Sequence, residues 1–317
     1  MWGFSNAHFQ TIAPSLLVSK SKAKFVHEVF ELDDGDFVDL AWHGTPEVDD
    51  RDIIVLLHGL EGSVYSPYAF LMMQALDRQG FNSVVMHHRG CFKAQNRLAR
   101  AYHSGETGDA RAFISDLHQR YPQRKLAAIG YSLGGNMLMK LQGEWGDETP
   151  LFAAVSVSAP LRLSLTADHI NQGLSRFYQY ILMKDLKNSL LEKYNNHDYE
   201  TLIGLKKELV PSLKSFWEYD DLFTGPIHGF KGADEYYERS SAYPYLTKIR
   251  RPTLIIHAKD DPFMPVSVLP TQEMMTPHLE LSLSDHGGHV GFIGGTPLAP
   301  KFWLCERIPR FFKEKMV

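Results

Sequence analysis

The sequence has few cysteines, no long hydrophobic run and no large excess of charge of either sign. Two cysteines in 317 residues, Cys91 and Cys305, are too few for the disulfide framework of a secreted domain, so free thiols in a reducing compartment are expected. The first residues show neither the basic nor the apolar region of a signal peptide, and no apolar run reaches the length of a membrane span. These absences predict a cytoplasmic protein without an integral membrane segment.

Motifs for nucleic acids, metals and phosphate-bearing cofactors are also missing. A formal net charge of −4 gives no electrostatic basis for binding nucleic acid. No zinc-type or EF-hand spacing and no glycine-rich phosphate fingerprint occurs. His87 and His88 are adjacent on a predicted strand, so their side chains point to opposite faces and cannot easily share one ion. We therefore expect no cofactor, no metal and no nucleic-acid partner.

The sequence does contain an alternation of strand-like and helix-like segments. Several short apolar runs, such as residues 51–58 and 252–258, are typical of strands that are covered on both faces. Helical patterns follow most of them, which predicts an α/β fold with a mostly parallel central sheet flanked by helices and a leading antiparallel hairpin. The predicted strands cover residues 24–32, 37–43, 51–58, 82–88, 125–129, 151–159, 252–258 and 278–283. The predicted helices cover residues 67–79, 108–120, 136–145, a segment from about 266, and 301–315.

Two stretches do not follow this alternation. The first twenty or so residues lack periodicity and are expected to lie over the body as an arm. Residues 161–250 are rich in aromatic side chains and mostly helical, and they are too long for an ordinary loop. We therefore predict a core formed by residues 1–160 and 251–317, with a helical cap inserted at 161–250.

The strongest functional motif is Gly130-Tyr131-Ser132-Leu133-Gly134, at the junction of a predicted strand and a predicted helix. This is the G-x-S-x-G pattern of a nucleophile elbow, in which a sharp turn pushes the serine hydroxyl out above the sheet. The flanking glycines are required because strand and helix crowd together there. A glycine-rich turn without chemistry could carry the same five letters, but the strand–turn–helix context favours Ser132 as a nucleophile.

A serine nucleophile needs a base and a carboxylate that orients the base. Candidates for both follow the last predicted strands, in the chain order serine, acid, histidine that accompanies a nucleophile elbow. Asp261 is favoured as the acid because Pro262 follows it directly, and Asp260 stays open as an alternative. His289 is favoured over His286 because two glycines precede it and would let the backbone approach the elbow.

An oxyanion hole needs two backbone amides aimed at the developing negative charge. The amide of Leu133 directly follows the nucleophile, and the loop after the first buried strand supplies a second donor, for which Leu60 is the candidate. His58, at the start of that loop, is expected to be a structural hydrogen-bonding group. Cys91 does not follow a comparable turn, which argues against a thiol nucleophile.

With these motifs assembled, the chain resembles the YheT-like branch of the α/β-hydrolase superfamily over essentially its whole length. The most specific matches are the histidine motif at residues 286–292 and Arg-Gly-Cys at 89–91. The remaining matching segments are residues 6–11 (Asn-Ala-His-Phe-Gln-Thr), 58–63 (His-Gly-Leu-Glu-Gly-Ser), 102–107 (Tyr-His-Ser-Gly-Glu-Thr), 130–136 (Gly-Tyr-Ser-Leu-Gly-Gly-Asn) and 260–263 (Asp-Asp-Pro-Phe).

The resemblance implies an α/β-hydrolase fold with a Ser132–His289–Asp261 charge relay and a serine hydrolase acting on esters. It also implies substrates such as short- to medium-chain acyl esters or lipid-like molecules. Two other functions remain open from the sequence. One is acyl transfer to an alcohol by the same triad, and the other is a non-catalytic binding protein on the hydrolase scaffold, which normally lacks a triad residue. Arg89 and residues 102–105 are expected to have structural roles, and the sequence leaves the oligomeric state open.

Overall fold

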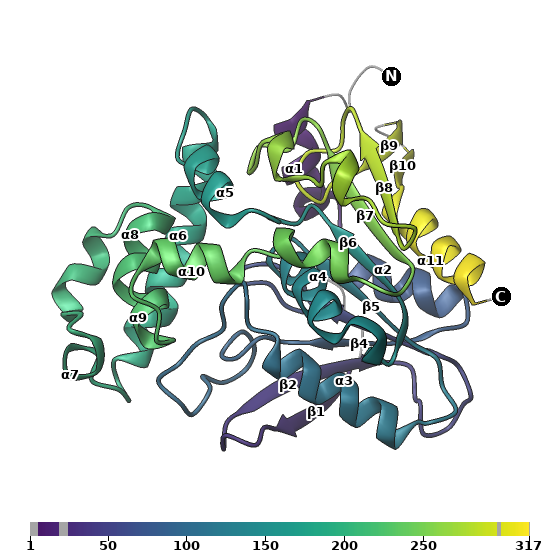
Figure 1. The fold of residues 1–317 in the computed structure, drawn as a ribbon, viewed down its shortest axis with the longest axis horizontal. Coiled ribbons are helices and arrows are strands. Elements are labelled where there is room, and N and C mark those ends of the chain that lie inside the picture. Colours follow the sequence, from purple (N-terminus) through teal and green to yellow (C-terminus); the bar gives the residue numbers. More distant parts are fainter. Residues whose placement is uncertain (1–5, 19–24, 297–298, 317) are drawn as a thin grey trace.

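The computed structural model describes residues 6–18, 25–296 and 299–316. Within these residues, eight strands form one sheet in the order β1-β2-β4-β3-β5-β6-β7-β8. Six of them, from β4 to β8 in that order, run parallel, and β1 and β2 are antiparallel at one edge (Figure 1). The strands are β1 Val26–Glu31, β2 Phe37–His43, β3 Ile53–Leu57, β4 Asn82–Met86, β5 Leu126–Tyr131, β6 Leu151–Val157, β7 Thr253–Ala258 and β8 Leu279–Ser284. The predicted, mostly parallel sheet is confirmed; Lys24, where the first predicted strand starts, lies outside the described residues.

Helices cover both faces of this sheet, and its central strands are therefore buried on both sides. All five side chains of β3 and of β4 are buried. One face packs against α3 (Gly108–Arg120) and α4 (Leu133–Trp145), and the other packs against α2 (Pro67–Arg78) and α11 (Leu304–Lys315). The continuous apolar runs of the sequence therefore correspond to strands enclosed between two hydrophobic layers.

Residues 161–250 contain helices and no strand. Figure 1 shows α6 to α10 gathered at one side of the sheet, and their side chains form hydrophobic clusters separate from the two layers on the sheet. The elements are α5 Leu163–Ile170, α6 Ser175–Lys193, α7 Tyr199–Ile203, η2 Lys207–Ser212, α8 Phe216–Tyr219, the π-helical turn η3 Asp220–Thr224, α9 Gly225–Ile227, α10 Ala233–Ser240 and η4 Tyr243–Lys248. The division of the chain into a core and an inserted cap stays a prediction.

One predicted helix was wrong, and two other predicted segments differ from the structure in detail. The described part of the N-terminal arm is a helix, α1 (Ala7–Leu17), which begins where the Asn6 side chain accepts a hydrogen bond from the amide of Phe9. The segment from Val266 forms short 3₁₀ turns, η5 (Val266–Val268) and η6 (Gln272–Met274). The last helix begins at Leu304, because a small hairpin of β9 (Ile293–Thr296) and β10 (Ala299–Phe302) precedes it.

The turn between β5 and α4 is tightly packed against neighbouring backbone. A Cβ atom on Gly130 would lie 2.6 Å from the Cα atom of Gly135, and one on Gly134 would lie 2.5 Å from the carbonyl oxygen of His58. Both distances are far below van der Waals contact, and the neighbouring atoms are backbone that cannot move aside. The two glycines of the G-x-S-x-G pattern are therefore required by packing alone.

We predict that Gly130→Ala destabilises the fold by at least about 1–3 kcal/mol, the usual effect of overpacking a rigid core. Gly294→Ala is the matched control, since a Cβ atom there meets no heavy atom within 4 Å. Chemical denaturation of the three proteins measures the difference. Equal midpoints for Gly130→Ala and the native chain would contradict the packing argument.

Candidate active site

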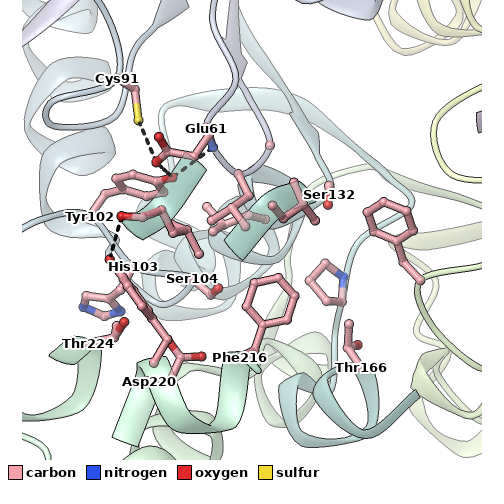
Figure 2. Close-up of a pocket in the computed structure, with 18 of the residues that line it drawn as sticks. Glu61, Cys91, Tyr102, His103, Ser104, Ser132, Thr166, Phe216, Asp220 and Thr224 are labelled. Atoms are coloured by element: carbon pink, nitrogen blue, oxygen red, sulfur yellow. Dashed lines mark hydrogen bonds between the residues drawn. The ribbon is translucent and has the colours of Figure 1, made fainter. Parts of the chain in front are cut away.

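Ser132 lies at the turn between β5 and α4 in a backbone conformation that serine rarely adopts. Its φ is 51° and its ψ is −119°, and its amide donates to the carbonyl of Val157 over 2.8 Å. Left-handed backbone at a residue with a Cβ is strained, and it persists only where the surroundings enforce it. The turn directs Ser132 into a cavity of about 430 Å³ (Figure 2).

His289 and Asp261 meet Ser132 in the arrangement that a serine nucleophile needs. The Oγ atom of Ser132 lies 3.0 Å from Nε2 of His289, and Nδ1 of His289 lies 2.9 Å from Oδ2 of Asp261. Asp261 is buried, with 4% of its surface exposed, and its second oxygen accepts the amide hydrogen of Phe263 at 2.8 Å. The structure thus brings together the three residues that the sequence favoured.

Asp260, the alternative acid, points away from this group. Its Oδ1 atom accepts hydrogen bonds from the amides of Gly287 and Gly288, each over 2.9 Å, and its Oδ2 atom contacts the imidazole of His286 at 3.1 Å. Asp260 and His286 therefore form a separate pair that holds the histidine loop. Neither reaches Ser132 through any contact in the described residues.

The backbone amides of Leu60 and Leu133 face no protein acceptor in the part of the chain that the structure describes. Both residues line the cavity beside Ser132, and neither amide donates to a protein group within the described residues. His58 fixes the loop that carries Leu60: its Nδ1 atom bonds to the carbonyl of Gly59 at 2.7 Å, and its Nε2 atom accepts from the amide of His88. His58 thus has the structural role that the sequence predicted.

Glu61 is a pocket residue that the sequence analysis did not identify. Its φ is 50°, and its carboxylate accepts hydrogen bonds from the hydroxyls of Tyr102 at 2.7 Å and Ser189 at 2.8 Å. The Tyr102 hydroxyl also accepts the amide hydrogen of Glu61, so Glu61 and Tyr102 are joined twice (Figure 2). Because Ser189 belongs to α6, this carboxylate connects the Leu60 loop to the helices of residues 161–250.

The cavity walls are mainly apolar, and both the helical segment 161–250 and the loops around Ser132 contribute to them. The apolar lining includes Leu163, Ala167, Ile170, Leu182, Leu186, Leu190, Phe216 and Phe223.

Asp220 lies across the cavity from Ser132 in Figure 2, and it accepts a hydrogen bond from the Tyr237 hydroxyl at 2.7 Å. Burial raises the pKa of Asp220 to about 6, against the effect of hydrogen bonds from Thr224 and Tyr237. The Cys91 thiol also lines the cavity, and burial beside Glu61 raises its pKa well above the ordinary value, which argues against a thiolate nucleophile.

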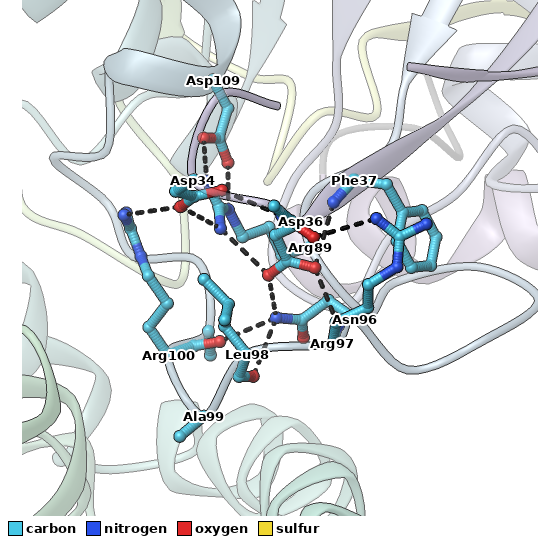
Figure 3. A network of polar contacts seen from close by, with 12 residues as sticks. Asp34, Asp36, Phe37, Arg89, Asn96, Arg97, Leu98, Ala99, Arg100 and Asp109 are labelled. Atoms are coloured by element: carbon cyan, nitrogen blue, oxygen red, sulfur yellow. Dashed lines mark hydrogen bonds and ion pairs between the residues drawn. The ribbon is translucent and has the colours of Figure 1, made fainter. Parts of the chain in front are cut away.

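Arg89 follows β4 and joins its loop to the turn between β1 and β2 and to α3 (Figure 3). Its guanidinium is 2% exposed, binds Asp109 through two hydrogen bonds of 2.7 and 2.6 Å, and contacts Asp34 at 2.8 Å and Asp36 at 3.0 Å. Burial alone would raise the pKa of Asp36, but hydrogen bonds to its carboxylate and the charge of Arg89 hold that pKa below the ordinary value. This network gives Arg89 the structural role expected from the sequence.

The histidines next to Arg89 are neutral packing groups. Burial lowers the pKa of His87 and that of His88 to about 4. The Nε2 atom of His87 accepts from the amide of Val64, whereas that of His88 bonds to the carbonyl of His58.

Across residues 6–18, 25–296 and 299–316, no group of three or more His, Cys, Asp or Glu side chains could hold a metal ion. In the same residues no helix is both long and apolar enough to cross a bilayer.

The fold and this geometry define the class of protein. The family described as alpha/beta hydrolase fold matches residues 52–296, and the chain belongs to that family. It is 46% identical to the Escherichia coli (strain K12) protein named "Putative esterase YheT". The alignment spans 310 residues and covers 98% of this chain and 91% of that protein. The resemblance to the YheT-like branch is thereby confirmed.

Two further comparisons find similar proteins in other organisms. The Saccharomyces cerevisiae protein named "Medium-chain fatty acid ethyl ester synthase/esterase 2" is 33% identical over 296 residues, covering 83% of this chain and 62% of that protein. The solved structure of the Pyrococcus furiosus esterase Pf2001 superposes with a TM-score of 0.59 at 18% sequence identity, covering 92% of each chain. At that identity the structural likeness shows the shared fold alone.

We predict that Arg89→Met lowers the free energy of unfolding by about 3–5 kcal/mol at pH 7, because three carboxylates lose their buried counter-ion. A carboxyl whose pKa is depressed in the folded chain stabilises it above the unfolded pKa, and this stabilisation is lost as the pH falls. The difference between Arg89→Met and the native chain should therefore shrink below about pH 4. Denaturant titrations at pH 7 and in acid measure it.

Arg97→Met is the control for this prediction. Arg97 also pairs with a carboxylate, Glu31, but the two side chains are 49% and 61% exposed, so solvent screens the pair and the loss should be much smaller than for Arg89→Met. If Arg89→Met and Arg97→Met were equally stable at pH 7, the buried network would not have the assigned role.

Proposed function

We propose that the protein is a serine hydrolase that cleaves carboxylic esters through an acyl-enzyme. The observation that carries the proposal is the contact of Ser132 with His289 and of His289 with Asp261, at 3.0 and 2.9 Å, beside two unpaired amides. A hydroxyl, an imidazole and a buried carboxylate in this order are the parts that activate a serine for attack on a carbonyl.

Each residue has a definite role in the proposed reaction. The Oγ atom of Ser132 attacks the ester carbonyl while Nε2 of His289 takes its proton, and Asp261 holds the Nδ1 hydrogen and so fixes the imidazole. The amides of Leu60 and Leu133 donate to the oxyanion of the tetrahedral intermediate. His289 then gives the proton to the departing alcohol, and a water molecule, activated in the same way, releases the acid from Ser132.

The cavity supports an acyl ester with an apolar chain as the substrate. Its walls are mostly apolar and its volume of about 430 Å³ lies in the range of small-molecule sites. The name of the yeast relative refers to medium-chain fatty acid ethyl esters, which supports a substrate with a short- to medium-chain acyl group here. We further propose that residues 161–250 act as a cap that holds the acyl chain, and that the protein works in the cytoplasm.

We predict that the native protein reacts with a fluorophosphonate probe at Ser132 and that Ser132→Ala does not. Hydrolysis of p-nitrophenyl esters should fall at least about a thousandfold in this variant, because the nucleophile is gone. Mass spectrometry of the labelled protein identifies the modified residue. Equal labelling of the native chain and of Ser132→Ala would remove Ser132 as the nucleophile.

We also predict that kcat/KM rises with acyl length and then falls. Each added methylene that enters the apolar cavity should raise kcat/KM by about fourfold, the equivalent of about 0.8 kcal/mol. The rise should end once the chain fills the cavity. A series of p-nitrophenyl esters from acetate upward measures the profile, and a flat profile would argue against an acyl-binding cavity.

Acyl transfer to an alcohol is the second candidate function. The name of the yeast relative contains both synthase and esterase, and the proposed acyl-enzyme would serve either reaction. Product analysis with a short alcohol present separates the two, because transfer yields a new ester and hydrolysis yields the acid. A non-catalytic binding role is the less favoured alternative, since all three residues of the proposed relay are present and in contact.

A further inference from the structure

The loop that carries His289 has few hydrogen bonds of its own. Within residues 286–292, one backbone bond closes the loop, from the amide of Phe292 to the carbonyl of Gly287. The other backbone amides donate hydrogen bonds to side chains from distant parts of the chain. Gly287 and Gly288 donate to Asp260, His289 donates to Thr11, and Val290 donates to Ser158. The position of the imidazole therefore depends on these distant groups.

Helix α1 supplies the bond at His289 itself. The hydroxyl of Thr11 donates to the carbonyl of Ala7 at 2.8 Å, which leaves its lone pairs for the amide of His289 at 2.9 Å. One residue earlier, the buried side-chain amide of Gln10 exchanges two hydrogen bonds with the backbone of Ile293, of 2.9 and 2.7 Å. Successive residues of α1 thus hold the loop at His289 and again just after its end.

The helix and the loop are also in direct backbone contact. A Cβ atom on Gly288 would lie 2.7 Å from Oγ1 of Thr11, and one on Gly291 would lie 2.7 Å from the carbonyl carbon of Gln10. These two glycines flank His289 on either side. Side chains at either position would push α1 away from the loop.

An aromatic stack joins the same helix to the imidazole ring. The Phe263 ring lies parallel to that of His289, with centroids 3.9 Å apart, and Tyr178 of α6 packs against Phe263 at 5.1 Å. The hydroxyl of Tyr178 is hydrogen-bonded to Nδ1 of His8 over 2.9 Å. The imidazole of His289 therefore packs on Phe263, and Tyr178 connects Phe263 to His8 in α1.

The contacts of α1 are directed at this loop rather than at the hydrophobic core. Its buried residues are Gln10 and Ala13, whereas Phe9, Ile12 and Leu16 are between 41% and 76% exposed. A helix that served only to cover the core would bury its large apolar side chains. The polar and close backbone contacts of α1 point to another role.

We propose that α1 is a clasp that positions His289, with Thr11 as a positioning residue that acts through the backbone amide. This inference deepens the proposed function and depends on it for its catalytic consequence. The chemistry at Ser132 needs the imidazole within hydrogen-bond reach, and a displacement of about 1 Å in a reacting group can lower the rate by about a hundredfold.

Thr11→Val tests the clasp, because it keeps the shape of the side chain and removes the acceptor for the His289 amide. We expect kcat to fall at least about tenfold with KM within about twofold, and the rate of fluorophosphonate labelling to fall in the same proportion. Thr11→Ser keeps the hydroxyl and should retain activity within about twofold of the native chain. Thr201→Val is the matched control, since the Thr201 hydroxyl also bonds at the start of a helix but lies outside the cavity lining.

Hydrogen exchange of residues 286–292 provides a readout that does not depend on activity. Peptides covering these residues should exchange at least about tenfold faster in Thr11→Val than in the native chain, Thr11→Ser or Thr201→Val. Unchanged exchange, or unchanged kcat in Thr11→Val, would overturn the clasp. If Thr11→Val does not fold, Tyr178→Phe, which breaks the bond to His8, should lower kcat, and an unchanged kcat in Tyr178→Phe would equally overturn the clasp.

A native chain that neither hydrolyses esters nor reacts with the probe would refute the proposed function, and the exchange rates would still decide whether α1 holds the loop.

Discussion

The left-handed backbone at Ser132 is the constraint on which the site depends. It is held by the hydrogen bond that the amide of Ser132 donates to the carbonyl of Val157 in β6, and by the close approach of α4 to the strands beneath it, where two glycines leave no room for a Cβ atom. The strain is sustained because the parallel sheet and α4 bury a large apolar surface on that face. The core of the fold therefore fixes where the hydroxyl lies, and the loops that follow the later strands are arranged around that point.

Much of the fold and the main residues of the site could be predicted from the sequence. Apolar runs such as β3 and β7 are local signals, and they gave the strands and their parallel arrangement. Ser132 was evident because the strand–turn–helix context is encoded in adjacent residues. Asp261 and His289 followed from their places after the last two strands of the sheet, since parallel strands bring those loops to the same edge.

The remaining features depend on contacts between distant residues, which no local pattern records. Asp260 and Asp261 are neighbours with the same side chain, and only the fold shows that one contacts His289 and the other holds the amides of Gly287 and Gly288. Helix α1 has no buried apolar stripe, so periodicity could not reveal it. Glu61 was missed for the same reason, because its partners Tyr102 and Ser189 come from two other segments.

The bond between Thr11 and His289 joins positions 278 residues apart, and it has a consequence for synthesis. At ribosomal speeds of about 5–20 residues per second, α1 emerges roughly 15 to 55 seconds before the segment that it holds. During that interval Thr11 lacks the amide of His289 to which it bonds in the folded chain. The contact between α1 and the loop of His289 can therefore form only after all eight strands of the sheet have been synthesised.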